Sequence, residues 1–284
     1  MKKKLILTSI LCLAQAAFAT PSFEVKVSGS GAPILFIPGL ACDGSVWDEA
    51  VARYSDSYEC HVLSIAGFAG TPPLAVNEPL LDTVKEDLAS YIKKESLEKP
   101  LIVGHSLGGF IALSLAIDHP EIASQLMVVD SLPFLPAVMN PTATVETTKA
   151  QAKAQKEMTS QGSQNEAQLQ MMLQTMVTDP RNIDRAHAMS LTSHGPSVAQ
   201  AMYELNTIDL RDKVSKIQTP TTVLGAWYGY AQFGATQESV ANTFRSQYAQ
   251  HTNYRFVMSE RGKHFIMWDD PELFNQELDK ILRD

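Results

Sequence analysis

The chain has 284 residues, of which 45% are hydrophobic and 19% charged, a composition typical of a globular protein with one large domain. Its formal net charge of −8 disfavours binding to nucleic-acid backbones and to anionic membrane surfaces. The expected partner is therefore a small, mostly uncharged molecule, and no nucleic acid.

The first 19 residues have the pattern of a secretory signal peptide. Three lysines at positions 2–4 precede a largely apolar run over residues 5–19, which ends in the small-residue pattern Ala17-Phe18-Ala19. This run is shorter than the roughly 20 apolar residues that a membrane-spanning helix needs. We predict cleavage after residue 19, no membrane anchor on the mature chain, and a periplasmic or secreted location.

Short apolar segments alternate with helical patterns through the first half of the mature chain. Short apolar runs of this kind are typical of buried parallel strands. They predict strands over residues 34–37, 60–65, 101–103 and 126–129, with helices over residues 80–94 and 110–118 among them. The alternation predicts an α/β fold with a mostly parallel central sheet and helices on both faces.

The pentapeptide Gly104-His105-Ser106-Leu107-Gly108 follows the third predicted strand and begins the next helix. It matches G-x-S-x-G, which forms a nucleophile elbow in a strand-turn-helix context. The helix start supplies free N–H groups near the point where negative charge develops. Ser106 is therefore the predicted nucleophile of an acyl-enzyme mechanism. A simple turn with a capping serine is the alternative interpretation.

The segment of about residues 133–216 is rich in Ala, Gln, Met and Thr and has helical spacing. An insertion between parallel strands emerges at their carboxyl edge, where open α/β sheets bind ligands. We therefore predict a helical cap within one domain over residues 20–284. Met172 and Met176 share a helix face by their spacing and are predicted to contact substrate. Ordinary packing of these methionines between the cap helices and the sheet is an alternative of at least equal weight.

Two further strands are predicted after the insertion, over residues 221–224 and 254–258. His264 lies on the loop after the second strand, before a helix that begins near residues 269–272. This loop belongs to the same sheet edge as Ser106, so the imidazole can accept the serine proton and pass it to the leaving group. His264 is therefore the predicted base.

Nearly the whole mature chain resembles the α/β-hydrolase superfamily of capped serine esterases and lipases, and two short segments carry the resemblance. They are Gly104-His105-Ser106-Leu107-Gly108-Gly109 and Lys263-His264-Phe265. The resemblance implies an eight-stranded sheet with a cap, the order Ser, acid, His, and no metal or organic cofactor. By position it assigns the oxyanion hole to the backbone N–H groups of Leu40 and Leu107. A plain turn at residues 38–39 is the alternative for the first of these.

The acid of the triad is missing from the position that most relatives use, after the strand that follows the cap. Residues 224–230 contain no carboxylate, and Trp227 and Tyr228 are predicted to line the substrate pocket there instead. A minority of relatives carry the acid after the strand that precedes the cap, where this chain has Asp130. We predict Asp130 as the acid, with a structural, turn-capping aspartate as the alternative.

Together these features predict a serine hydrolase that cleaves a carboxylic ester or a related acyl bond of a small, mostly uncharged substrate. A C–C hydrolase, a lactonase or an aminopeptidase on the same scaffold is a second interpretation. A non-catalytic, ligand-binding relative is a third. Cys42 and Cys60 are predicted to be free thiols, because they lie at opposite ends of neighbouring strands.

Overall fold

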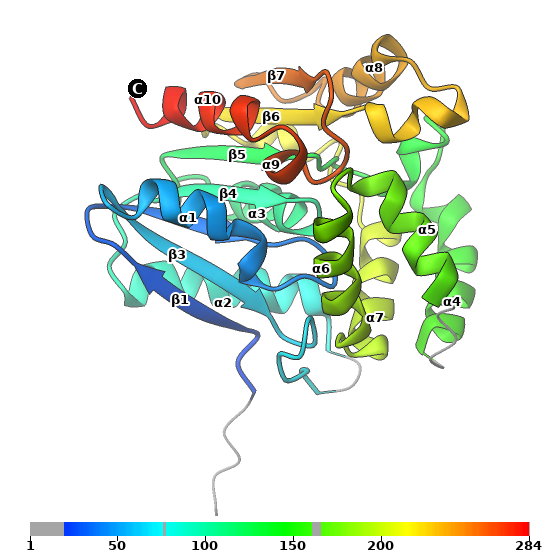
Figure 1. Cartoon of the computed structure of the whole chain (residues 1–284), viewed down its shortest axis with the longest axis horizontal. Coiled ribbons are helices and arrows are strands. Elements are labelled where there is room, and N and C mark those ends of the chain that lie inside the picture. The colour runs from blue at the N-terminus through cyan, green and yellow to red at the C-terminus, as the bar shows by residue number, and fades with distance from the viewer. Residues whose placement is uncertain (1–19, 76–77, 161–165, 284) are drawn as a thin grey trace, which may run out of the picture.

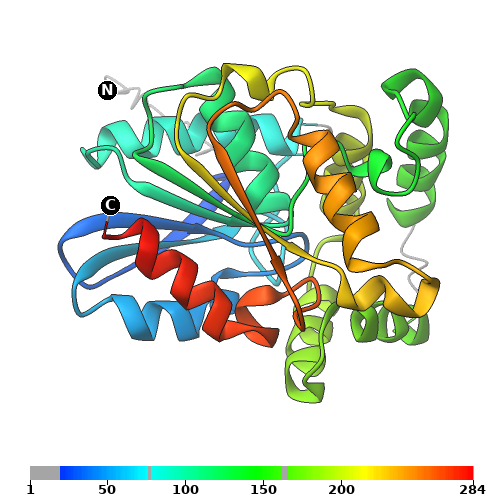
Figure 2. The same cartoon turned by 90° about the horizontal axis from the view of Figure 1, so that it is seen from above.

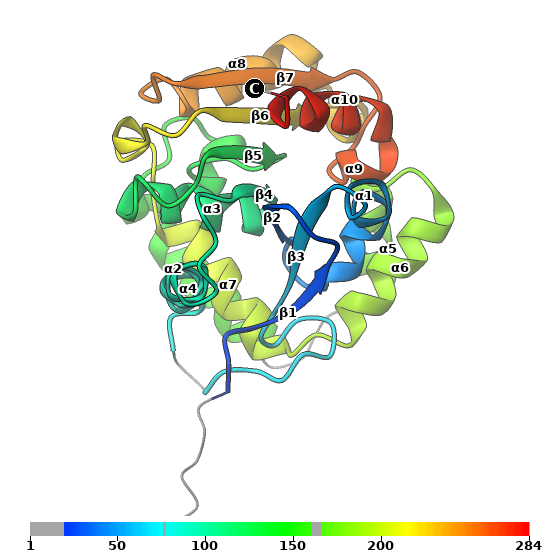
Figure 3. The same cartoon turned by 90° about the vertical axis from the view of Figure 1, so that its left-hand side faces the viewer.

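The computed structural model describes residues 20–75, 78–160 and 166–283, so the predicted signal peptide lies outside the described residues. Within those ranges the chain forms a seven-stranded sheet in the order β1-β3-β2-β4-β5-β6-β7 (Figure 3). β1 is antiparallel to β3, and the other neighbouring pairs are parallel. The strands are β1 (Phe23–Ser28), β2 (Ala32–Ile37), β3 (Tyr58–Ile65), β4 (Leu101–His105), β5 (Gln125–Val129), β6 (Thr221–Ala226) and β7 (Tyr254–Ser259).

The mostly parallel sheet confirms the predicted fold class, and each predicted strand is present. The resemblance implied eight strands, but the described residues contain seven. Only residues 20–22 are described before β1, which is too short for another strand beside it. β1 was not predicted, although its exposure alternates roughly along the strand, as expected for an edge strand with one solvated face.

Both faces of the sheet are buried, because consecutive residues of the central strands belong to opposite hydrophobic clusters. In β2, Leu35 and Ile37 pack on one face, and Ile34 and Phe36 pack on the other. Figure 3 shows the two helical layers that cover these faces. The first layer comprises α2 (Leu80–Lys94), α3 (Leu107–Asp118) and α8 (Gln237–Gln247), and the second comprises α1 (Asp48–Tyr54) and α10 (Pro271–Ile281).

The segment predicted to form a cap is helical and lies between β5 and β6. Figure 1 shows its helices beyond the carboxyl ends of the parallel strands, and Figure 2 shows the same arrangement from above. The carboxylate of Glu204 accepts hydrogen bonds from the backbone N–H groups of Leu80 and Leu81. These bonds attach the insertion to the start of α2. The inserted helices are α4 (Val145–Ser160), α5 (Glu166–Met176), α6 (Pro180–Leu191) and α7 (Gly195–Thr207).

The two cysteines of the described chain are free and buried, which confirms the predicted thiols. Cys60 lies in β3 opposite Ile34 of β2, whereas Cys42 lies beyond the end of β2. Burial raises the pKa of the Cys42 thiol to about 12 and that of the Cys60 thiol to about 11. In the described part of the chain, no helix combines the length and the apolar character needed to cross a membrane.

Candidate active site

Ser106 occupies a strained turn between β4 and α3. Its φ of 53° and ψ of −117° lie outside the ordinary regions for a residue with a side chain. Its N–H donates to the carbonyl of Val129 at 2.9 Å, which ties the turn to the end of β5. A Cβ at Gly104 would lie 2.4 Å from the carbonyl oxygen of Gly108, so the turn requires glycine there. A Cβ at Gly108 would lie 2.3 Å from the carbonyl oxygen of Ile37, so glycine there lets the start of α3 pack against the end of β2.

Asp130 and His264 meet directly, although 134 residues separate them in the chain. The Nδ1 atom of His264 lies 2.6 Å from Oδ2 of Asp130, and the aspartate side chain is only 6% exposed. A carboxylate in this position accepts the Nδ1 hydrogen, which leaves Nε2 of His264 as a proton acceptor. The arrangement orients the imidazole as a general base requires.

The end of β6, the strand that follows the insertion, holds the Asp130 carboxylate in place. The backbone N–H of Ala226, the last residue of β6, donates to Oδ1 of Asp130 at 2.8 Å. The N–H of Asp130 itself donates to the carbonyl of Leu224 at 2.8 Å. The end of β6 therefore has no carboxylate of its own but fixes the carboxylate that β5 provides.

His105, the last residue of β4, connects the turn at Ser106 to the histidine loop, residues 260–265 between β7 and α9 (Ile266–Asp269). Its Nε2 atom lies 3.0 Å from the carbonyl oxygen of His264, so Nε2 carries the hydrogen and donates it. Burial, with a smaller contribution from the nearby His264 ring, holds the pKa of His105 well below its usual value, so this imidazole is neutral. The sequence did not indicate this hydrogen bond, because no local pattern predicts a contact with a backbone carbonyl 159 residues later in the chain.

The loop after β2 packs closely against Ser106 at Gly39. A Cβ at this position would lie 2.9 Å from Nδ1 of His105 and 3.3 Å from Cβ of Ser106. Leu40 follows immediately, and Leu107 is the first residue of α3, where N–H groups lack partners within the helix. The structure thus brings the segments that carry both predicted oxyanion donors to the same turn.

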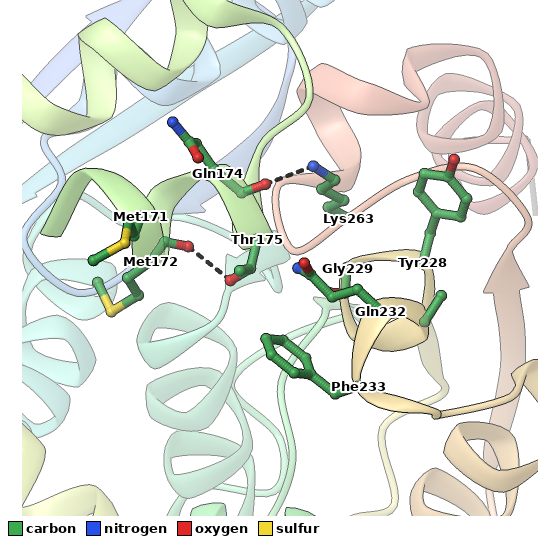
Figure 4. Close-up of a pocket in the computed structure, with 10 residues that line it drawn as sticks. Met171, Met172, Gln174, Thr175, Tyr228, Gly229, Gln232, Phe233 and Lys263 are labelled. Carbon is green, nitrogen blue, oxygen red and sulfur yellow. Dashed lines mark hydrogen bonds between the residues drawn. The ribbon is translucent and has the colours of Figure 1, made fainter. Parts of the chain in front are cut away.

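A cavity of about 860 Å³ lies between α5 and the short helix η4 (Tyr228–Phe233), as Figure 4 shows. Met172 and Tyr228 line it, together with Met171, Phe233, Gln232 and Lys263 among others. Of the other predicted pocket residues, Met176 packs against the buried cluster on the α1 face, and the Trp227 ring contacts that of Tyr228. The cavity volume is within the range of small-molecule sites, but Ser106, Asp130 and His264 are not among the residues that line it.

Lys263 is the charged residue among those that line this cavity. Its ammonium donates to the backbone carbonyls of Gln174 at 2.6 Å and Val177 at 3.2 Å. Both bonds hold the ammonium against the backbone at the end of α5. The other functional groups of the lining are thioethers, aromatic rings, amides and the hydroxyls of Thr175 and Tyr228.

Comparison with known proteins agrees with this architecture. The alpha/beta hydrolase family model matches residues 34–277. A pimeloyl-[acyl-carrier protein] methyl ester esterase from Vibrio atlanticus is 24% identical over 199 residues, which are 68% of this chain and 75% of that protein. The esterase of the same name from Aeromonas hydrophila is 30% identical over 112 residues, 39% of this chain but only 42% of that protein.

A solved structure extends the comparison to the whole fold. An esterase from Exiguobacterium antarcticum superposes with a TM-score of 0.76 at 19% identity, over 92% of this chain and 96% of that one. The family model alone spans most of the chain, from the second strand to the last helix. The chain is therefore a hydrolase that belongs to the alpha/beta hydrolase family.

Proposed function

We propose that the protein is a carboxylesterase that forms an acyl-enzyme on Ser106. The observation that carries this proposal is the 2.6 Å contact between His264 and the buried Asp130, at the sheet edge where Ser106 occupies its strained turn. In the proposed reaction, Nε2 of His264 accepts the serine proton as Oγ attacks the ester carbonyl, and then donates it to the departing alcohol. Water subsequently attacks the acyl-enzyme with the same base and releases the acid.

The backbone N–H groups of Leu40 and Leu107 are the proposed donors to the oxyanion. Donors of this kind each stabilise the transition state by about 3 to 4 kcal/mol in enzymes where they have been removed. Gly39 supports this role, because the absence of a side chain there lets the Leu40 loop approach Ser106 closely.

Replacement of Gly39 by alanine is expected to lower kcat about tenfold or more. The new Cβ would approach Nδ1 of His105 to 2.9 Å, so the loop must move and the Leu40 donor with it. Steady-state kinetics on an ester substrate would measure the effect. Gly195→Ala is the matched control, since a Cβ there meets only the Thr159 carbonyl oxygen at an ordinary 3.6 Å. A Gly39→Ala enzyme with the kcat of the control would contradict the proposed position of the oxyanion hole.

The cavity between α5 and η4 supports a small ester with an uncharged, apolar portion as substrate. Thioether and aromatic side chains at Met171, Met172, Tyr228 and Phe233 line it. Methionine surfaces of this kind adapt to ligands of different shape. We propose that these residues determine how the enzyme selects among acyl or alcohol groups of different length.

A substrate panel with a fluorophosphonate probe tests the proposed function. The probe is expected to label Ser106, and chromogenic esters of graded acyl length are expected to react faster than matched amides or lactones.

Phe233→Ala should shift the preferred acyl length of the ester substrate, because this ring is 72% exposed and forms part of the cavity wall. Failure of the wild-type protein to label would favour a ligand-binding relative. Preference for the lactone or the amide would favour the second interpretation, an enzyme of another specificity on this scaffold.

A further inference from the structure

We propose that Lys263 is a positioning residue, whose ammonium group couples the inserted helix α5 to the geometry of His264. The inference rests on the proposed function, because it takes His264 to be the catalytic base. Figure 4 shows Lys263 reaching from the histidine loop to the end of α5, with its bond to the Gln174 carbonyl drawn as a dashed line.

The C-terminus of α5 is capped by the two residues that flank His264. The last carbonyl groups of a helix have no partner within the helix and must find one elsewhere. Here the Lys263 ammonium binds the carbonyls of Gln174 and Val177, and the N–H of Phe265 donates to the carbonyl of Met176 at 3.3 Å. The positive charge of Lys263 also complements the negative end of the helix dipole.

Asp269 strengthens the same connection from the short helix α9 (Ile266–Asp269). Its carboxylate accepts the backbone N–H and the hydroxyl of Thr178, both at 3.0 Å, just beyond the end of α5. One of its oxygens also lies 3.2 Å from the backbone N of Lys263, which donates to it. One carboxylate therefore holds both the segment after α5 and the residue before His264.

The remaining bonds to His264 come from the sheet. Asp130 binds its ring, and His105 binds its carbonyl oxygen. A displacement of α5 would consequently move the residues on either side of His264, whereas Asp130 and His105 would still hold its ring and its carbonyl oxygen. The imidazole would then change its orientation. A catalytic group misplaced by about 1 Å can cost a factor on the order of 100 in rate. The contacts at Lys263 thus place the base, in addition to stabilising the helix.

The variant Lys263→Met tests this inference, because it keeps a long aliphatic side chain beside Gly229 and removes the bonds to the carbonyls of Gln174 and Val177. We expect kcat to fall about 10- to 100-fold with KM changed less than about threefold. The rate of fluorophosphonate labelling should fall by a similar factor, since it reports the activation of Ser106. Lys263→Arg keeps the charge and the donors and should restore most of the activity.

A pH profile separates positioning from a direct effect of the lysine charge. Positioning predicts a lower plateau of kcat/KM with the same apparent pKa. A direct charge effect predicts a raised apparent pKa of the base with an unchanged plateau, because removal of a nearby cation favours the protonated imidazole. Lys99→Met is the matched control. Lys99 precedes the amino-terminal end of β4, whereas Ser106 follows its carboxyl-terminal end, and the Lys99 ammonium pairs with the exposed Glu121. This control should retain wild-type kinetics.

A folded Lys263→Met protein with wild-type kcat and labelling rate would overturn the inference, and so would a change in KM alone. If circular dichroism shows that Lys263→Met does not fold, Asp269→Ala removes the second connection and decides the question. A lowered plateau in Asp269→Ala would support positioning, and wild-type kinetics would overturn it. An unlabelled wild-type protein would instead refute the proposed function itself, so the two failures are distinguishable.

Discussion

Replacing Ser106 with alanine is expected to lower kcat by about 10⁴ or more on any ester that the wild-type protein hydrolyses. The acyl-enzyme route disappears with the hydroxyl, whereas the groups that bind substrate remain. KM should therefore change little, and labelling by a fluorophosphonate should be lost. His264→Ala should have nearly the same effect on kcat, because the serine and its base act as a unit and their losses are not additive.

The control for this experiment is another serine that is exposed and remote from the nucleophile turn. Ser215→Ala removes only a bond from the hydroxyl to the carbonyl of Asp212, and it should leave kcat unchanged. If Ser106→Ala kept more than about a tenth of wild-type turnover on its best substrate, Ser106 would not be the nucleophile. The strained turn at residues 104–108 would then need another explanation.

Asp130→Asn is expected to cost several orders of magnitude in kcat, up to about 10⁴, with little loss of fold. The amide oxygen can still accept the N–H of Ala226, as Oδ1 of the aspartate does now at 2.8 Å. The amide nitrogen would then face Nδ1 of His264 and donate to it. This contact favours the tautomer that carries its hydrogen on Nε2, which cannot accept a proton from Ser106.

Glu238→Gln is the matched control for the acid, because Glu238 is the first carboxylate after β6 in the sequence. It lies in the first turn of α8, where it is exposed. We expect wild-type kinetics from this variant. If Glu238→Gln lost activity, or Asp130→Asn turned over normally with an unchanged circular dichroism spectrum, then Asp130 would not be the residue that orients His264.

The sequence by itself was enough to predict the central sheet and the nucleophile turn. Short apolar runs and the glycines at positions 104 and 108 are local properties, because each depends on residues close together in the chain. The sequence did not predict the edge strand β1, because its few apolar residues alternate with polar ones over only six positions. The lining of the cavity was predicted only in part, because helix spacing does not reveal which face of α5 meets η4.

The contact between Asp130 and His264 was decided by the tertiary structure. The sequence offered Asp130 as a carboxylate at a strand end, beside the alternative of a structural turn. Its proximity to a histidine 134 residues later depends on β5, β6 and β7 lying side by side in that order. The bond from His105 to the carbonyl of His264 and the bonds from Lys263 to the carbonyls of Gln174 and Val177 depend on the same packing. Strand order is set by how the whole core closes, which is a property of distant residues together and of no single segment.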